Sequence, residues 1–292
     1  MALSIRPLDA AVAAAWDRFV DARPEGTFFH RAGWADVIER GFGHETHYTC
    51  VERDGAITGV LPLARVKTLL FGDTLISVPF CVYGGPLAAD AESAALLTAH
   101  AESLLRRSGA RALEFRHLHD VGTDADRWVQ RPDLYVTFRN PIEGDHDRNM
   151  KTIPRKQRAM VRKAMQNGLV SVVNRDADLL HRVYAESVRN LGTPVFPRRY
   201  FRLLLDAFGH DADIVTVLDQ GAPIASVMNF YFRDEVLPYY GGGTPAARGR
   251  AGNDFMYWEV MRLAADRGCR LFDFGRSKIG TGAFAFKHNW GF

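Results

Sequence analysis

The sequence predicts an α/β (α+β) protein built from two tandem copies of one unit. Three observations predict it: both halves present the same order of strand and helix patterns, each half carries a Tyr-Gly-Gly stretch before a helix, and a basic helical segment joins the halves. A repeat of about 100 residues or more that occurs twice indicates a duplicated domain rather than a solenoid. The chain has 292 residues, 47% of them hydrophobic, which is enough for two domain cores.

The first half begins with a short apolar strand and continues through two helices into a hairpin. Strand patterns on both sides of Gly55 predict the hairpin, and Gly109 suits the left-handed end of the long helix that follows. In chain order we expect a strand at 3–5, helices at 9–22 and 31–41, a hairpin at 46–67, the stretch Tyr83-Gly84-Gly85, a helix at 92–110 and a strand at 111–115.

The second half repeats this order, with Gly221 in its hairpin turn and Gly268 at the end of its long helix. In chain order we expect a strand at 169–173, helices at 176–190 and 197–209, a hairpin at 212–233, the stretch Tyr240-Gly241-Gly242, a helix at 254–269 and a strand at 270–274. The domains expected are therefore 1–147 and 148–292, with the basic segment near 150–167 as the bridge.

Together, this order of elements resembles the GNAT acyltransferase fold, and two GNAT-like units in tandem resemble the FemAB family of aminoacyl and peptidyl transferases. The chain is most similar to the FemAB-related proteins associated with exosortase/PEP-CTERM gene clusters. The resemblance covers nearly the whole chain, and FDFGRS with GAFAFKHNWGF is among its most specific parts. The stretches that carry it are FFHRAGWADVI (28–38), GVLPLARV (59–66), VYGGPL (82–87), IPRKQRAMVRKAMQNGL (153–169), FDFGRS (272–277) and GAFAFKHNWGF (282–292).

The resemblance implies a donor site where the fourth and fifth strands of the second unit part. Backbone N–H groups at the next helix N-terminus would bind the phosphates of the donor's carrier. The glycines of the stretch would allow close approach and unusual dihedrals, and Asn253 or Asp254 would cap the helix. The donor-binding residues expected are Gly241, Gly242, Gly243, Arg248, Gly249, Arg250, Gly252 and Asn253. The alternative is a flexible connection without a ligand.

Coenzyme A enzymes of this fold carry Gln or Arg where Ala246 stands. The donor is therefore left open between aminoacyl-tRNA and acyl-CoA, as a co-substrate rather than a tightly bound cofactor. The first copy has no basic residue in its glycine stretch, so no donor site is expected there.

Lys287 and Asp273 are the expected catalytic residues. The pair Phe286-Lys287 matches a Phe-Lys pair that borders the transfer channel in FemAB proteins, where a lysine can neutralise an oxyanion, and Asp273 is a candidate general base. The alternatives are a surface lysine and a structural ion pair. The substrate-binding residues expected are Tyr239, Tyr240, Arg276, Ser277, Phe286, Arg155 and Lys156. The family usually continues through further strands, so the second unit is expected to be shortened or to lack its last strands.

The joining segment is strongly basic: residues 145–200 hold 12 Lys and Arg against 5 Asp and Glu. Helical spacing places Met160, Val161, Ala164 and Met165 on one side, opposite a charged face. That face would attract a polyanion such as tRNA or a nucleotide-linked sugar; the alternative is a solvated interdomain helix.

Several classes of protein are disfavoured. The three cysteines, Cys50, Cys81 and Cys269, form no CxxC pair, so neither a disulfide framework nor a metal site is expected. The N-terminal segment has acidic residues where a signal peptide would be apolar, and the longest uncharged run, 74–89, is too short for a membrane span. A cytoplasmic protein without membrane insertion is expected.

The expected function is an acyl or aminoacyl transferase that forms an amide on an amine of a cell-envelope or exopolysaccharide precursor. Its partners would be the acyl donor, tRNA-linked in one version, and an anionic or sugar-linked acceptor. The alternatives are a non-catalytic GNAT-fold scaffold in exopolysaccharide assembly and a coenzyme A-dependent N-acyltransferase.

Overall fold

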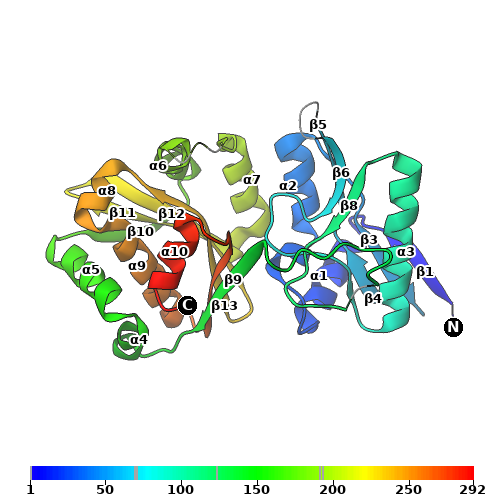
Figure 1. Ribbon diagram of the computed structural model, residues 1–292, viewed down its shortest axis with the longest axis horizontal. Helices are drawn as coiled ribbons and strands as arrows, with labels where there is room; N and C mark the ends of the chain where they lie inside the picture. The colour runs from blue at the N-terminus through cyan, green and yellow to red at the C-terminus, as the bar shows by residue number, and fades with distance from the viewer. Residues whose placement is uncertain (1, 69–71, 123, 191, 193) are drawn as a thin grey trace. The chain divides into compact units, whose positions relative to one another are not determined.

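The structure, a computed structural model, describes residues 2–68, 72–122, 124–190, 192 and 194–292. It divides into two compact units, Met1–Trp128 (unit 1) and Val129–Phe292 (unit 2) (Figure 1). The division lies before the expected 147/148 because residues Tyr135–Pro141 form a strand, β9, that belongs to the sheet of unit 2. Across the described residues, no helix is both long and apolar enough to cross a membrane.

Unit 1 contains all the elements expected from the sequence and several short strands besides. Its elements are β1 (Leu3–Pro7), α1 (Ala13–Ala22), η1 (Phe28–His30), α2 (Gly33–Phe42), β2 (Glu45–Thr46), β3 (Thr49–Arg53), β4 (Ala56–Leu61), β5 (Ala64–Thr68), β6 (Gly72–Ser77), β7 (Leu87–Ala88), α3 (Ala91–Ser108) and β8 (Ala112–Phe115). They form two sheets, ordered β1-β3-β4-β7 and β2-β5-β6-β8.

The long helix α3 begins and ends where its sequence dictates. Asp90 accepts a hydrogen bond from the Ser93 N–H at the N-terminus, which satisfies one of the free donors there. Gly109 takes the expected left-handed conformation at the C-terminus, with φ of +67°. Leu97 and Ala101 of this helix are buried against the strands.

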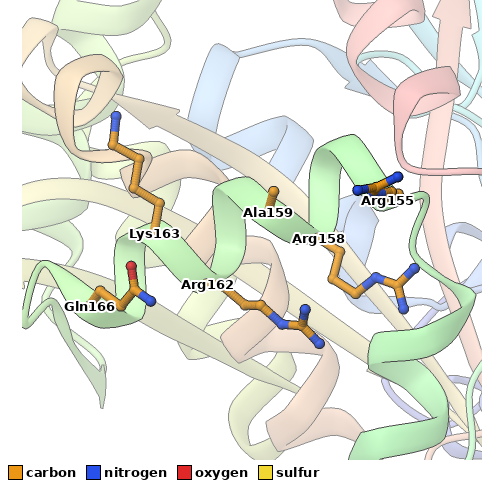
Figure 2. Close-up of a pocket in the computed structure, with 6 residues that line it drawn as sticks. All are labelled: Arg155, Arg158, Ala159, Arg162, Lys163 and Gln166. Atoms are coloured by element: carbon orange, nitrogen blue, oxygen red, sulfur yellow. The ribbon is translucent and has the colours of Figure 1, made fainter.

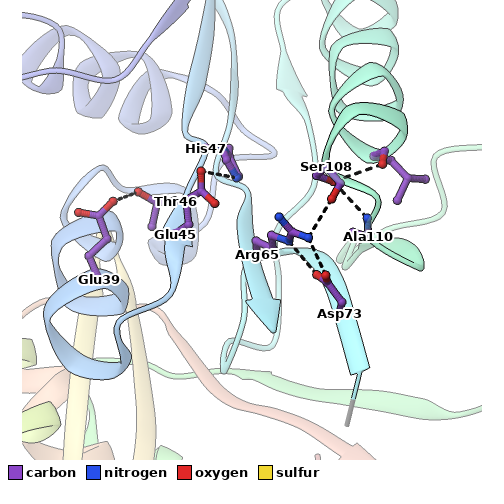
Figure 3. Close-up of polar contacts among 9 residues, drawn as sticks. Glu39, Glu45, Thr46, His47, Arg65, Asp73, Ser108 and Ala110 are labelled. Carbon is purple, nitrogen blue, oxygen red and sulfur yellow. Dashed lines mark hydrogen bonds and ion pairs between the residues drawn. The ribbon is translucent and has the colours of Figure 1, made fainter. Parts of the chain in front are cut away.

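An arginine on β5 fixes the other end of α3 (Figure 3). Arg65 donates to both carboxylate oxygens of Asp73 on β6, at 2.8 and 2.6 Å, and to the Ser108 carbonyl oxygen at 2.8 Å. A cation at a helix C-terminus is favourable because the last carbonyl groups lack partners within the helix. This contact therefore ties the β5–β6 hairpin to α3.

Unit 2 repeats the element order of unit 1 but begins with three additional elements, the strand β9 followed by two helices. Its elements are β9, α4 (His146–Thr152), α5 (Arg155–Gln166), β10 (Val170–Asn174), α6 (Ala177–Asn190), α7 (Arg198–Phe208), η2 (Gly209–Asp211), β11 (Ala212–Asp219), β12 (Ala222–Phe232), β13 (Glu235–Gly243), α8 (Pro245–Arg250), α9 (Gly252–Asp266), β14 (Leu271–Lys278) and α10 (Gly282–Asn289). One sheet runs β10-β11-β12-β13-β14-β9.

Helices cover both faces of this sheet. A Cβ on Gly242 would collide with the Ser187 side chain of α6, and one on Gly243 would collide with Asn253 of α9. Because neighbouring residues of a strand point to opposite faces, α6 covers one face and α9 the other (Figure 1).

The basic helix α5 packs on α9 within unit 2. Its buried residues are Gln157, Val161 and Ala164, one turn or two apart. Met165, expected on the apolar side, is 42% exposed, because the buried stripe is narrower than the sequence pattern implied.

The strands β13 and β14 are parallel for two residue pairs only, Glu235↔Leu271 and Val236↔Phe272. Beyond these pairs they part. The equivalent strands of unit 1, β6 and β8, stay paired from Thr74↔Ala112 to Ser77↔Phe115. The two units thus differ in the length of this parallel pairing. It is the position where the sequence predicts a donor site in the second unit and none in the first.

Candidate active site

The fork where β13 and β14 part is held by an arginine from β9. Arg139 pairs with Asp273 of β14, with 3.2 Å between its Nε and Oδ2, and also forms an ion pair with Glu235 of β13. A guanidinium that lies between two carboxylates attracts both of them and so bridges the two strands. Arg139 therefore joins the two strands at the last point where they are still paired.

Next to the fork, β14 bulges around a lysine ammonium. The β14–β9 register shifts between Asp273 and Arg276, and Gly275 in the bulge has φ of +66°, a conformation that favours glycine. Lys287 Nζ, from α10, donates to the carbonyl oxygens of Phe274, Gly275 and Arg276 at 2.6, 3.2 and 3.2 Å. An ammonium has three N–H donors, so the bulge uses all of them.

Lys287 is half-buried, and this shifts its pKa. Burial lowers the pKa of Lys287 to about 8, with the charge of Asp273 acting in the opposite direction. Its ammonium also lies 5.9 Å from the centre of the Phe138 ring. The alternative of a plain surface lysine does not describe this residue.

Asp273 is 1% exposed and its carboxylate already has partners. Oδ1 accepts from the Gly275 N–H at 2.6 Å, and Oδ2 faces Arg139. These contacts hold the Asp273 carboxylate against the bulge. Asp273 and Lys287 lie close enough for their charges to interact, and both contact the backbone of the β14 bulge.

The remaining residues expected on β14 and α10 surround the same bulge. The Arg276 guanidinium lies 4.3 Å from the centre of the Tyr135 ring, and Ser277 is buried. Phe286 packs in an aromatic group with Tyr257, Phe274 and Trp290. This group forms an apolar wall between α9, β14 and α10.

On the other side of the opening, β13 carries a bulge of its own. Its register with β12 shifts so that Tyr240 pairs with Met228 and Pro238 with Asn229, which leaves Tyr239 as the extra residue. Tyr240 is buried, and its hydroxyl lies 2.7 Å from that of Tyr200. Tyr239 packs on Tyr240 at a ring distance of 4.7 Å, so the two expected tyrosines form one aromatic layer with α7.

Packing within unit 2 explains the three glycines at the end of β13. A Cβ on Gly241 would lie 2.8 Å from the Val227 side chain. A Cβ on Gly242 would lie 2.5 Å from Ser187, and one on Gly243 would lie 2.4 Å from Asn253. Real Cβ atoms do not approach so closely, so larger residues would displace these neighbours. The glycines therefore have a structural reason independent of any donor, and their donor-binding role is left as a proposal.

The connection after β13 differs from the expected loop. Gly249 and Gly252 lie in α8 and α9, and the left-handed residue between these helices is Ala251, with φ of +57°. The expectation of unusual dihedrals at the two glycines was wrong, because the segment is helical on both sides of a single non-glycine turn. Neither Asn253 nor Asp254 caps α9, whose N-cap residue is Ala251.

The polar residues of this connection have separate environments. Arg250 pairs with Asp219, with 2.8 Å between Nε and Oδ2, and donates to the Asn167 carbonyl oxygen at 2.9 Å. Arg248 is exposed on α8. Asn253 Oδ1 is buried and has no hydrogen-bond partner among the described residues. Of the two expected arginines, Arg248 is the one that the structure leaves exposed.

Arg155 and Lys156 lie elsewhere, at the start of α5. Arg155 lines a hollow on the outer side of this helix together with Arg158, Ala159, Arg162, Lys163 and Gln166 (Figure 2). The residues expected to bind substrate thus fall into two groups, one at the β13–β14 opening and one on α5.

Residues 148–288 match a sequence profile described as an acetyltransferase (GNAT) domain. The matched residues lie within unit 2, and the match supports an acyltransferase enzyme. The fold of two tandem GNAT-like units predicted from the sequence is confirmed by the solved structures that follow.

A crystal structure of FemX is similar over 99% of this chain and 94% of its own, with a TM-score of 0.74 and 17% identity. A tandem GNAT protein from the clavulanic acid biosynthesis pathway is similar over 99% and 94%, with a TM-score of 0.59 and 14% identity. The C-terminal domain of a putative lysylphosphatidylglycerol synthetase from Agrobacterium fabrum is similar over 97% and 89%, with a TM-score of 0.58 and 14% identity. No curated protein matches the sequence.

Sequence reasoning missed the residues of β9 that lie at the fork between β13 and β14. Tyr135, Phe138 and Arg139 contact Arg276, Lys287 and Asp273 respectively. The alternation of Tyr135, Thr137 and Arg139 with Val136 and Phe138 is a strand pattern. That alternation could have predicted the strand β9 from the sequence, but it does not indicate which strand β9 pairs with.

Proposed function

We propose that unit 2 transfers an acyl or aminoacyl group to an amine and forms an amide, with the donor's carrier between β13 and β14. The observation that carries the proposal is the parting of these strands after two residue pairs. Beyond the fork, the backbone groups on the facing edges of β13 and β14 do not pair with each other. Backbone N–H and C=O groups need hydrogen-bond partners. A carrier with amide groups would supply them.

The proposed reaction has three parts that the site must assist. An uncharged amine attacks the donor's carbonyl carbon, negative charge develops on the carbonyl oxygen, and the carrier leaves with the proton that the amine gives up. Backbone N–H groups fixed at a bulge are suited to the developing oxyanion. The two bulges, at Tyr239 and at Phe274–Gly275, stand one on each side of the opening.

Lys287 and Asp273 are proposed to serve transfer by holding the β14 bulge. All three ammonium donors go to carbonyl oxygens, and the carboxylate is engaged by Arg139 and Gly275. In this role they fix Arg276 and Ser277, the residues proposed to contact substrate. Tyr239, Tyr240 and Phe286 would form the aromatic walls.

The proposed acceptor is an amine on a cell-envelope or exopolysaccharide precursor, the class that the resemblance of the sequence to FemAB-related proteins implies. The proposed donor is acyl-CoA or aminoacyl-tRNA, and because both occur in the cytoplasm the reaction is proposed to take place there. Arg248, Gly249 and the start of α9 with Gly252 and Asn253 would meet its phosphates, with Gly241–Gly243 and Arg250 shaping the connection.

A non-catalytic binding protein is the second candidate, favoured by one observation. The donors of Lys287 and the space beside Gly241–Gly243 are already used by the chain itself. Such a protein would bind an acceptor without turning a donor over.

Protection of an introduced thiol tests the donor site directly. The native cysteines are buried, so Arg276→Cys adds a thiol beside the opening that a maleimide can label, and Arg18→Cys on α1 is the matched control. Acyl-CoA or aminoacyl-tRNA should slow labelling of Arg276→Cys and leave Arg18→Cys unchanged. If neither donor slows it, the opening does not bind the carrier and the second candidate is favoured.

A further inference from the structure

The outer side of α5 presents five cations that the fold does not neutralise. Arg155, Lys156, Arg162 and Lys163 are exposed and Arg158 is half-buried. Four of them surround a hollow of about 470 Å³ that has Ala159 and Gln166 as its other lining residues. Within the part of the chain that the structure describes, no carboxylate forms an ion pair with any of the five. We call this surface the cationic face.

The arrangement of these charges is unfavourable for the helix itself. Arg155, Lys156 and Arg158 occupy the first turn, where no acidic residue stands and Pro154 provides no side-chain cap. Cations at a helix N-terminus oppose the helix dipole, and the like charges of Arg158 and Arg162, four residues apart, repel each other. A segment that breaks several local rules without internal compensation is expected at a functional site.

The inner side of α5 holds the helix in a fixed orientation. Gln157 donates to the buried Asp254 carboxylate of α9, and Val161 and Ala164 are fully buried. At the C-terminal end, Asn167 and Arg250 exchange hydrogen bonds in both directions, at 3.3 and 2.9 Å. The cationic face is therefore presented by an anchored helix.

The directions of the side chains point to an extended ligand. In Figure 2, Arg158 and Arg162 extend side by side on one side of the helix, whereas Lys163 and Arg155 extend on the other. A compact anion would meet only one of these pairs. An anion that lies along the helix meets both, with the small Ala159 between them leaving room for it.

We propose that the cationic face binds the phosphodiester backbone of a nucleic acid strand. The axial rise from Arg155 to Lys163 is about 12 Å, and a strand in a duplex carries a phosphate about every 3.4 Å of axis, so three or four phosphates match the four cations. Arginine guanidinium groups suit phosphate oxygens in pairs. A membrane surface fits less well, because a membrane-binding helix buries a broad apolar face in the lipid. The apolar side of α5 is already packed on α9, with Val161 and Ala164 fully buried, and Met165 is its exposed large apolar residue.

Binding of RNA by the full chain tests the proposal without any transfer reaction, so it does not depend on the acyl donor. The probe is a fluorescein-labelled oligouridylate of about 16 nucleotides, followed by fluorescence anisotropy at several salt concentrations. If four cations each meet a phosphate, the affinity should fall on the order of 50-fold between about 50 and 200 mM salt. Arg158→Glu with Arg162→Glu should weaken binding about tenfold or more and flatten the salt dependence.

The matched control is Arg18→Glu with Arg106→Glu, two exposed arginines on helices α1 and α3 of unit 1, which changes the net charge equally. It should bind RNA nearly as the parent does. Arg158→Gln with Arg162→Gln checks folding, because removing like charges from α5 should not lower the melting temperature. Equal losses in both Glu variants, or no loss in either, would overturn the proposal. So would binding to vesicles of phosphatidylcholine and phosphatidylglycerol, lost in Arg158→Glu/Arg162→Glu, without binding to RNA.

Discussion

At the scale of single residues, the hydrogen bonds of Lys287 decide between two roles, stabilising an oxyanion and holding the β14 bulge. A lysine that stabilises an oxyanion needs a free N–H, but the three donors of Lys287 reach the carbonyl oxygens of β14. The sequence could place this residue beside Phe286 near the end of the chain. It could not place the bulge, because Gly275 and the register shift depend on β9, more than a hundred residues earlier.

We expect Lys287→Met to lower stability and activity together. The side chain stays long but becomes apolar, so the carbonyl oxygens lose their ammonium, and an unsatisfied buried polar group costs about 1–3 kcal/mol. Thermal unfolding measures the first effect and an acyl transfer assay the second. Adding ammonium or methylammonium salts should restore part of both, with potassium salts as the ionic-strength control. Full stability with lost activity would instead favour direct contact with the oxyanion.

Asp254 is a second buried charge whose protonation has a measurable consequence. Burial raises the pKa of Asp254 from 3.8 to about 6, although Gln157 donates to it. Between these two values the folded chain keeps a proton that the unfolded chain has lost, so this group makes stability fall as the pH rises.

Asp254→Asn should remove that dependence. The amide oxygen can still accept from Gln157, and no charge has to be buried. At pH 7 the variant should be more stable than the parent by about 3 kcal/mol, and the difference should vanish below about pH 4. Urea unfolding at pH 4 and pH 7 checks both values. A pH-independent difference would show that the carboxyl group does not titrate in this range.

At the scale of elements, helix ends were predictable where a residue type determines them. Asp90 and Gly109 bound α3 as their sequence context indicates. The turn between α8 and α9 was not predictable, because Ala251 takes a left-handed conformation there while Gly249 and Gly252, better suited to it, remain helical. Tertiary packing of Gly252 against Ile224 and Ala247 overrides local preference at that point.

The strand β9 is the element that sequence analysis missed, and Arg139 tests its contribution. Arg139→Ala leaves the buried Asp273 carboxylate without its cation, and breaking such a pair costs about 3–5 kcal/mol. Chemical denaturation should show a loss of this size. Adding Asp273→Asn to Arg139→Ala should recover part of it, because the unpaired charge is then gone. A double variant as unstable as the sum of the single variants would mean that the two residues act independently.

At the scale of the whole molecule, the duplication was visible in the sequence because element order survives even where residues differ. A structural difference between the copies is visible in the strand pairing. β6 and β8 remain paired where β13 and β14 part, and a pattern of apolar residues does not encode how far two strands stay together.

The boundary between the units leads to a prediction about fragments of the chain. A fragment 148–292 matches the sequence boundary but lacks β9, so β14 would become an unprotected sheet edge and Asp273 would lose Arg139. A fragment 129–292 keeps both. Exposed edges promote association, so the shorter fragment should aggregate or unfold, whereas the longer one should give a cooperative thermal transition. Circular dichroism and size-exclusion chromatography of the two fragments decide this. If 148–292 folded as well as 129–292, β9 would be an accessory to the sheet, and the fork would have to be held by contacts within β13 and β14 alone.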